Sequence, residues 1–248
     1  GHGLRPREGS AVSSIIYNGH DFGDYVSAEL VEPVAHVVAP ESAKVPGRPG
    51  RVLLSADVEP LELRVRLFLD APDALTSAQR SELRRTLRSW LLNTAGSVLE
   101  VPGEPALEWH DVICAGVSDW SSLFSEGSAT VTFLALDPIA YGPERNSTAA
   151  TLEVGGTWPT WPVVEMVAVA GEDLQVGLGG SFVRMGRAFK AGDKVAIDMA
   201  AQTVTVGGQD ATGDVALASD FFALPPGRVE LLFVNCSSHV VRWRERWV

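Results

Sequence analysis

Alternation of apolar and polar side chains is clearest along residues 61–69. Each odd-numbered position there is apolar, and three of the four even-numbered positions carry a charge. Because successive side chains of a strand point to opposite faces, this pattern predicts a strand with one buried face. Apolar runs at 97–103, 108–124 and 127–136 predict three further strands.

Turn residues separate the extended segments. Asn18-Gly19 follows the apolar run at 15–17 and is the commonest signal for a two-residue hairpin turn. The stretch KVPGRPG at 44–50 combines two prolines and two glycines with two cations. Proline fixes φ and glycine accepts positive φ, so this stretch predicts a stiff turn between two strands.

One amphipathic helix is expected, at 76–92. Thr76 and Gln79 have the spacing of a capping box. Apolar side chains then recur along one helix face, at Leu83, Leu87, Trp90 and Leu91. The rest of the helix is rich in arginine, which is typical of a solvated face and would also suit an acidic neighbour.

The chain is expected to form two domains. Two prolines and a glycine interrupt regular structure at 137–143, and 144–150 has the composition of a linker. Beyond it, short strands separated by turn signals roughly every 8–12 residues indicate a β-sandwich. We therefore expect a mostly β protein with an N-terminal domain at 14–145 and a sandwich at 146–240. Residues 1–13 show no periodicity and are interpreted as a tag remnant or flexible leader.

Tryptophans mark candidate packing sites. The closing segment 241–248 alternates strictly and places Trp243 and Trp247 on the face opposite its arginines, which indicates a core or an interface. Trp158 and Trp161 each precede a proline. Because tryptophan is usually buried, core or interdomain packing is favoured over a sugar-stacking platform at both positions. The same reasoning makes the helix residue Trp90 a core anchor.

Composition and charge narrow the function. The chain has 20 Lys and Arg against 31 Asp and Glu, a formal charge of −11. Because an acidic surface repels phosphates, sequence-specific nucleic-acid binding is not expected. No apolar stretch is long enough to span a membrane and the N-terminus lacks an apolar signal core, so neither membrane insertion nor Sec-type export is expected. The distant Cys114 and Cys236 are interpreted as free thiols.

No catalytic or metal-binding motif is apparent, so we expect neither enzymatic activity nor a cofactor. The five histidines are scattered, and strand neighbours such as His110 and Asp111 point to opposite faces. The acidic residues between 193 and 214 suit turns better than calcium binding. One enzymatic alternative stays open, a cell-wall hydrolase that uses the carboxylates of Asp193 and Asp198.

Several stretches, taken in order, resemble the distal tail protein (Dit) family of long-tailed (siphovirus) bacteriophages and prophages. They are IIYNGHDFGDY at 15–25, VPGRPG at 45–50, LRSWLL at 87–92, ATVTFLALDPIAYGP at 129–143 and GGTWPTWPVVEM at 155–166. The similarity continues through AGDKVAIDMAAQTVTVGGQD, FFALPPGRVELLF and the closing VVRWRERWV. It therefore spans residues 15–248.

This resemblance implies a virion structural protein of the phage tail tip, without enzymatic activity. It implies a β-rich, ring-forming N-terminal domain with one α-helix, followed by a galectin-like β-sandwich. The hexameric ring would join the tail tube to the baseplate hub and adsorption apparatus, with DNA passing through its lumen. The implied partners are further copies of the chain, the major tail (tube) protein, the tail-associated hub protein and receptor-binding proteins. Assembly is expected in the bacterial host cytoplasm.

The resemblance also gives the charged turn at 44–50 a role as a projection that reaches the adjacent subunit. The ring-interface candidates are Lys44, Arg48, Arg51, Arg84 and Arg88.

Two further expectations concern the C-terminal half. In the family the chain end can return to the first domain, so 241–248 is expected to complete the N-terminal domain. The alternative function is a carbohydrate-binding adhesion module of a tail or cell surface, which would use Trp158, Trp161 and Trp243.

Overall fold

The computed structural model of the protein describes residues 14–31, 35–104 and 106–248. The predicted leader at 1–13 lies outside the described residues. The described chain divides into two compact units, one ending at Ala140 and the other comprising Tyr141–Val248. Each unit has its own hydrophobic core. Among the described residues, no helix has the length and apolar character that crossing a membrane requires.

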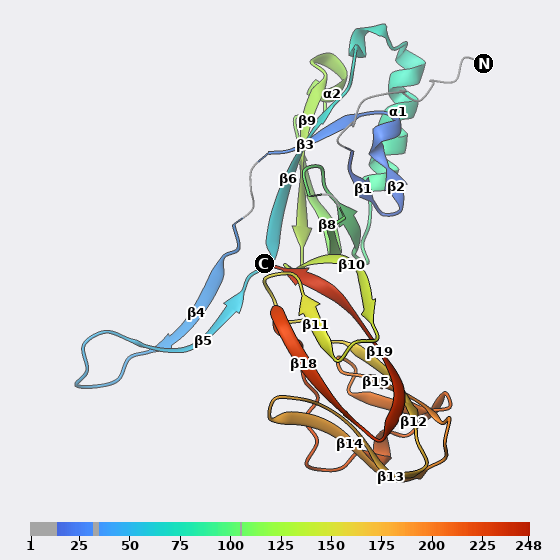
Figure 1. The fold of residues 1–248 in the computed structure, drawn as a ribbon. Coiled ribbons are helices and arrows are strands. Elements are labelled where there is room, and N and C mark those ends of the chain that lie inside the picture. The colour runs from blue at the N-terminus through green and yellow to red at the C-terminus, as the bar shows by residue number, and fades with distance from the viewer. Residues whose placement is uncertain (1–13, 32–34, 105) are drawn as a thin grey trace. The chain divides into compact units, whose positions relative to one another are not determined.

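The N-terminal unit is built on an antiparallel sheet (Figure 1). Its strands are β1 (Ile16–Tyr17), β2 (His20–Asp21), β3 (Ser27–Leu30), β6 (Leu61–Phe68), β7 (Ser97–Glu100), β8 (Glu108–Ser118) and β9 (Ser128–Ala135). They pair in the order β2-β1-β7-β8-β9-β6-β3. The alternation at 61–69 is confirmed, because side chains along β6 are buried and exposed in turn. The strand expected at 108–124 ends at Ser118, and the short helix α2 (Ser122–Ser125) follows.

The expected helix is confirmed as α1 (Ser77–Leu91). Thr76 accepts a hydrogen bond from the Gln79 backbone, and the Gln79 side chain accepts one from the Thr76 backbone, which completes the capping box. Leu83, Leu87 and Leu91 are buried on one face. This amphipathic face joins the sheet in one core.

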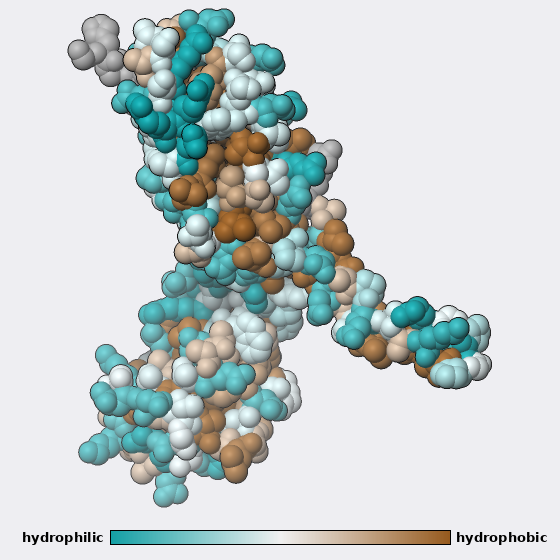
Figure 2. Space-filling model, turned by 180° about the vertical axis from the view of Figure 1, so that it is seen from behind, coloured by the Kyte–Doolittle hydropathy of each residue, from teal (hydrophilic) through white to brown (hydrophobic). Residues whose placement is uncertain are grey.

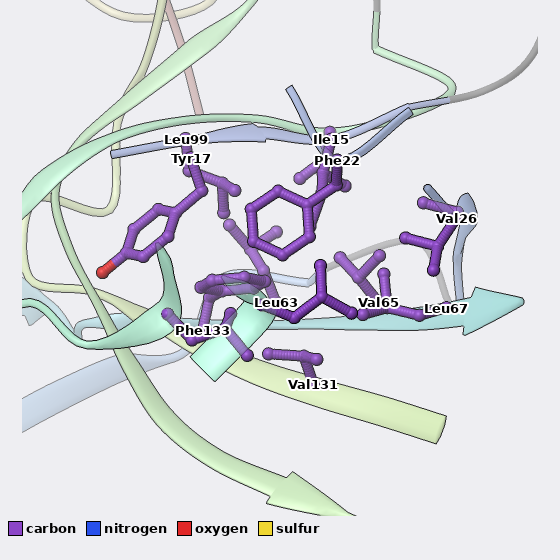
Figure 3. Packing of buried hydrophobic residues seen from close by; sticks show 14 of the residues in the cluster. Ile15, Tyr17, Phe22, Val26, Leu63, Val65, Leu67, Leu99, Val131 and Phe133 are labelled. Carbon is purple, nitrogen blue, oxygen red and sulfur yellow. The ribbon is translucent and has the colours of Figure 1, made fainter. Parts of the chain in front are cut away.

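Aromatic and aliphatic side chains fill the core of the N-terminal unit. Figure 3 shows Tyr17, Phe22 and Phe133 packed among branched aliphatic residues of several strands. The Tyr17 and Phe133 ring centroids are 4.9 Å apart, and the Tyr17 hydroxyl donates to the backbone oxygen of Val112. Tyr17 thus buries its ring without leaving its polar end unpaired.

Both turns predicted from the sequence, at Asn18-Gly19 and at 44–50, are present. Asn18 and Gly19 have φ of 54° and 74° and connect β1 to β2 as a two-residue hairpin turn. The segment 44–51 connects β4 (Val38–Ala43) to β5 (Val52–Val58), with Gly47 and Gly50 at positive φ. Within the described chain β4 and β5 pair only with each other, so they form a separate two-stranded ribbon (Figure 1).

The C-terminal unit is a sandwich of two antiparallel sheets, so the mostly β fold class is confirmed. Its strands are β10 (Ala140–Ser147), β11 (Thr151–Val154), β12 (Val163–Ala168), β13 (Gly171–Leu178), β14 (Ser181–Phe189), β15 (Lys194–Asp198), β16 (Thr203–Val206), β17 (Gln209–Asp210), β18 (Gly227–Val234) and β19 (Cys236–Trp247). One sheet has the order β17-β16-β15-β12-β19-β10 and the other β11-β18-β13-β14. Their inward side chains share one core.

Two expectations about domain limits differ from the structure. The segment 144–150, expected as a linker, is largely strand β10, because that strand finds a pairing partner in β19 despite its proline. The segment 241–248, expected to complete the N-terminal domain, lies in the C-terminal unit. There Val241 pairs with Val164 of β12 and is buried with Trp243 in the second core.

Candidate interaction surfaces

The charged turn lies at the tip of the β4–β5 ribbon. Lys44 and Arg48 are exposed there, and the Arg48 backbone N–H donates to the Val45 carbonyl oxygen. Arg51 differs from them, because its guanidinium donates from Nε to Ser42 Oγ and from Nη2 to the Ser42 carbonyl oxygen, at 2.8 and 2.7 Å. Of the three turn cations proposed for an interface, Lys44 and Arg48 thus lie in solvent while Arg51 braces the ribbon itself.

Exposed leucines on the ribbon were not anticipated from the sequence. Leu53 and Leu54 are neighbours on β5, and their side chains are 61% and 60% exposed. The pairing with β4 shifts between Glu41 and Ser42, which leaves Leu54 as the extra residue of a β-bulge, so two adjacent large apolar side chains lie in solvent at this point of the ribbon. Val37 and Val38 add exposed apolar surface near its base, and brown side chains are visible on the ribbon in Figure 2. The only hint in the sequence is the apolar run Val52-Leu53-Leu54 directly after the charged turn. The sequence does not show whether another segment covers this run.

The two helix arginines proposed for an interface have different surroundings. The Arg84 guanidinium carbon lies 4.8 Å from the Phe124 ring centroid, in cation–π geometry within its own chain. Arg88 lines a pocket of about 550 Å³ between the end of α1 and β8. Leu92 and Val117 also line this pocket, and Leu92 is largely exposed. The N-terminal unit therefore has a partly apolar, basic hollow beside its helix.

The five tryptophans proposed as anchors divide into two groups. Trp90 packs against the N-terminal core and stacks on His20 with ring centroids 4.7 Å apart, while Trp243 is buried in the C-terminal core. Trp158, Trp161 and Trp247 are instead partly exposed, by 38%, 41% and 37%. Neighbouring prolines and strand alternation did not reveal this difference, because both patterns allow a tryptophan to lie at a surface.

A second pocket, of about 420 Å³, lies within the C-terminal unit. Tyr141 of β10, Trp161 and three arginines of β19 contribute to its lining. The Arg246 guanidinium donates to the Pro159 carbonyl oxygen and to the Tyr141 hydroxyl, each at 3.2 Å. Arg246 thereby fixes the segment that carries Trp161 against the last strand.

The carboxylates considered for catalysis serve turns. Asp193 accepts from the Lys190 backbone N–H, and Asp198 accepts from the backbone N–H groups of Ala200 and Ala201. Within the described ranges, no cluster of three or more His, Cys, Asp or Glu side chains has the arrangement of a metal site. Both expected thiols are free, and burial raises the pKa of each.

Comparison with known proteins covers both units. Residues 155–247 match the family model of the siphovirus-type tail component, C-terminal domain. The SPP1 Dit protein, described as a paradigm of the hub adsorption apparatus in phages that infect Gram-positive bacteria, is similar in structure with a TM-score of 0.78 and 17% identity. That likeness covers 96% of this chain and 100% of the other.

A more distant likeness is to a chain of the phage p2 baseplate in its activated conformation with calcium, with a TM-score of 0.43 and 9% identity over 88% of this chain and 90% of the other. No curated protein matches the chain. The family match at 155–247 and the similarity to the SPP1 Dit structure confirm the resemblance inferred from the sequence, and the chain as a whole has the Dit fold.

Proposed function

We propose that this chain is a distal tail protein that closes into a hexameric ring at the tip of a long phage tail. The ring would join the tail tube to the baseplate hub and adsorption apparatus, and DNA would leave through its lumen. The family match of the C-terminal domain and the Dit fold of the whole chain support this proposal.

The β4–β5 ribbon is the observation that carries the ring proposal. A two-stranded ribbon is at best marginally stable alone in water. In the described chain it pairs with no third strand and leaves Leu53 and Leu54 in solvent. Covering both leucines on an adjacent copy would stabilise the ribbon and create the head-to-tail contact that a closed ring requires.

Charge supports the same arrangement. Lys44 and Arg48 are exposed at the ribbon tip of a chain whose formal charge is −11, so an approaching copy offers mainly carboxylates. Complementary charges would orient the ribbon on its neighbour. The acidic excess would also keep DNA phosphates from adhering to a lumen wall.

The proposed partners are other copies of the chain, the major tail tube protein, the tail-associated hub protein and receptor-binding proteins. They would meet at the virion tail tip after assembly in the bacterial host cytoplasm. We assign the chain no catalytic activity, and its role is to connect other tail components.

Light scattering of the purified chain over a range of concentrations tests the proposal, together with negative-stain microscopy. We expect a hexameric mass and ring-shaped particles that become more abundant as concentration rises. A chain that remains monomeric at all concentrations, and also when mixed with its tube and hub partners, would contradict it.

A further inference from the structure

Hydrogen bonds hold the walls of the pocket in the C-terminal unit. Its volume, about 420 Å³, lies in the range of small-molecule sites. The buried Thr160 donates from Oγ1 to the Arg244 carbonyl oxygen at 2.6 Å, and Arg246 holds the Pro159 carbonyl. These bonds tie the Trp161 segment to β19, so the pocket is formed before any ligand arrives.

An aromatic side chain is available for stacking. Trp161 lines the pocket and is 41% exposed, so part of its indole can accept a flat apolar partner. The apolar faces of sugar rings are partners of this kind. Trp158 has nearly the same exposure but is not among the lining residues, so only one of the two tryptophans serves this pocket.

Hydrogen-bond donors dominate the polar lining. Arg242, Arg244 and Arg246 follow each other at every second position of β19, on one face of the strand. Glu165 pairs with Arg242 at 2.9 Å. The lining therefore offers more donors and positive charge than acceptors, and a ligand that brings acceptors and negative charge would suit it.

The strand arrangement argues against an extended peptide as the ligand. β19 is paired on one side with β12 and on the other with β10, so it offers no free edge for an added strand. Recognition must therefore come from side chains. The carboxylate of Glu144 also lines the pocket and can accept hydrogen bonds from hydroxyl groups.

We infer that this pocket binds an acidic saccharide, a sugar that carries a carboxylate or a phosphate. One sugar face stacks on Trp161, the acidic group meets the arginines of β19, and Glu144 accepts from a hydroxyl. The site is separate from the proposed ring contact and adds a ligand-binding role to a connecting protein.

Calorimetric titration of the full chain tests this inference with four probes, glucuronic acid, glucose 1-phosphate, glucose and inorganic phosphate, each to about 20 mM. We expect at least one of the two acidic sugars to bind about tenfold more tightly than glucose and than phosphate. The first two probes distinguish carboxylate from phosphate as the acidic group. No binding by either acidic sugar, or equal binding of glucose or phosphate, would overturn the inference.

Matched variants locate the binding. Trp161→Ala should weaken the acidic sugar about tenfold, whereas Trp158→Ala, which removes an equally exposed indole outside the pocket, should leave affinity unchanged. Trp161→Phe keeps an aromatic face and should retain most of the affinity, which separates stacking from misfolding. Unchanged affinity in Trp161→Ala, or equal loss in Trp158→Ala, would show that the sugar binds elsewhere.

Discussion

Arg51 braces the β4–β5 ribbon by donating two hydrogen bonds to Ser42, one to its hydroxyl and one to its carbonyl oxygen. The two residues face each other across the base of the charged turn, which begins two positions after Ser42. A cation in this turn can therefore have either of two roles, to hold the turn in shape or to meet a partner. Arg51 has the first, and Arg48 is proposed for the second.

Arg51→Ala should loosen the ribbon tip without unfolding the units. Both bonds to Ser42 are lost, so we expect faster hydrogen exchange of the backbone amides in 42–52 and an unchanged melting temperature. Arg48→Ala is the matched control. It removes a nearby cation whose side chain does not brace the strands, so it should leave hydrogen exchange unaltered. Equal exchange in both variants would contradict the bracing role of Arg51.

Arg48→Glu should leave the subunit folded but impair ring closure. The substitution places a carboxylate where the proposed contact needs a cation, so like charges would repel. We expect unchanged circular dichroism and a smaller fraction of rings in micrographs, partly restored by added salt, which screens the repulsion. If this variant forms rings as readily as the parent, the turn has no part in the contact.

Replacing Leu53 and Leu54 together by aspartate should weaken assembly strongly. Each leucine would contribute roughly 1.5–3 kcal/mol on burial, so the loss of both should raise the concentration needed for rings at least about tenfold. Leu217→Asp is a suitable control, because Leu217 is fully exposed on the other unit. Dilution series followed by light scattering provide the measurement. Assembly unchanged by the double substitution would show that the ribbon leucines stay in solvent in the ring.

Two fragments test where the second unit begins. Residues 141–248 should fold alone, because their core is self-contained. A fragment of 146–248 loses the Gly142 carbonyl that accepts from Arg244 at 2.7 Å, and the Tyr141 hydroxyl that accepts from Arg246. We expect this shorter fragment to be less stable by about 1–3 kcal/mol in urea denaturation. Equal stability of the fragments would favour the boundary expected from the sequence.

Gly156→Ala should destabilise the C-terminal unit. Gly156 has a φ of +94°, and a Cβ there would overlap the Arg246 carbonyl oxygen, which also accepts from the backbone N–H groups of Thr157 and Trp158. We expect a loss of at least about 1–3 kcal/mol in the free energy of unfolding. Gly180→Ala should be tolerated, because Gly180 has open space around it. A normal melting temperature of Gly156→Ala would mean that this segment can shift away from β19.

Local chemistry made several elements predictable from the sequence. Asn18-Gly19 specified a hairpin turn through the backbone angles that these residues accept, and Thr76 with Gln79 specified the helix start through a reciprocal pair of hydrogen bonds. The alternation at 61–69 indicated which side of β6 is buried. These signals depend on residues within a few positions of each other, so they act before the chain has a tertiary structure.

Contacts between distant residues decided the rest. Pairing with β19 made a strand of most of the segment 144–150, whose polar residues resembled a linker, and Val241 and Trp243 are buried in the core of the sandwich. The pocket depends on Arg246 reaching Pro159 and Tyr141, which lie 87 and 105 positions away in the chain. The sequence by itself determined the turns, the helix and the buried faces of strands, because each is fixed by local geometry. Only the tertiary structure decided which side chains stay exposed, because exposure depends on which distant segments cover them.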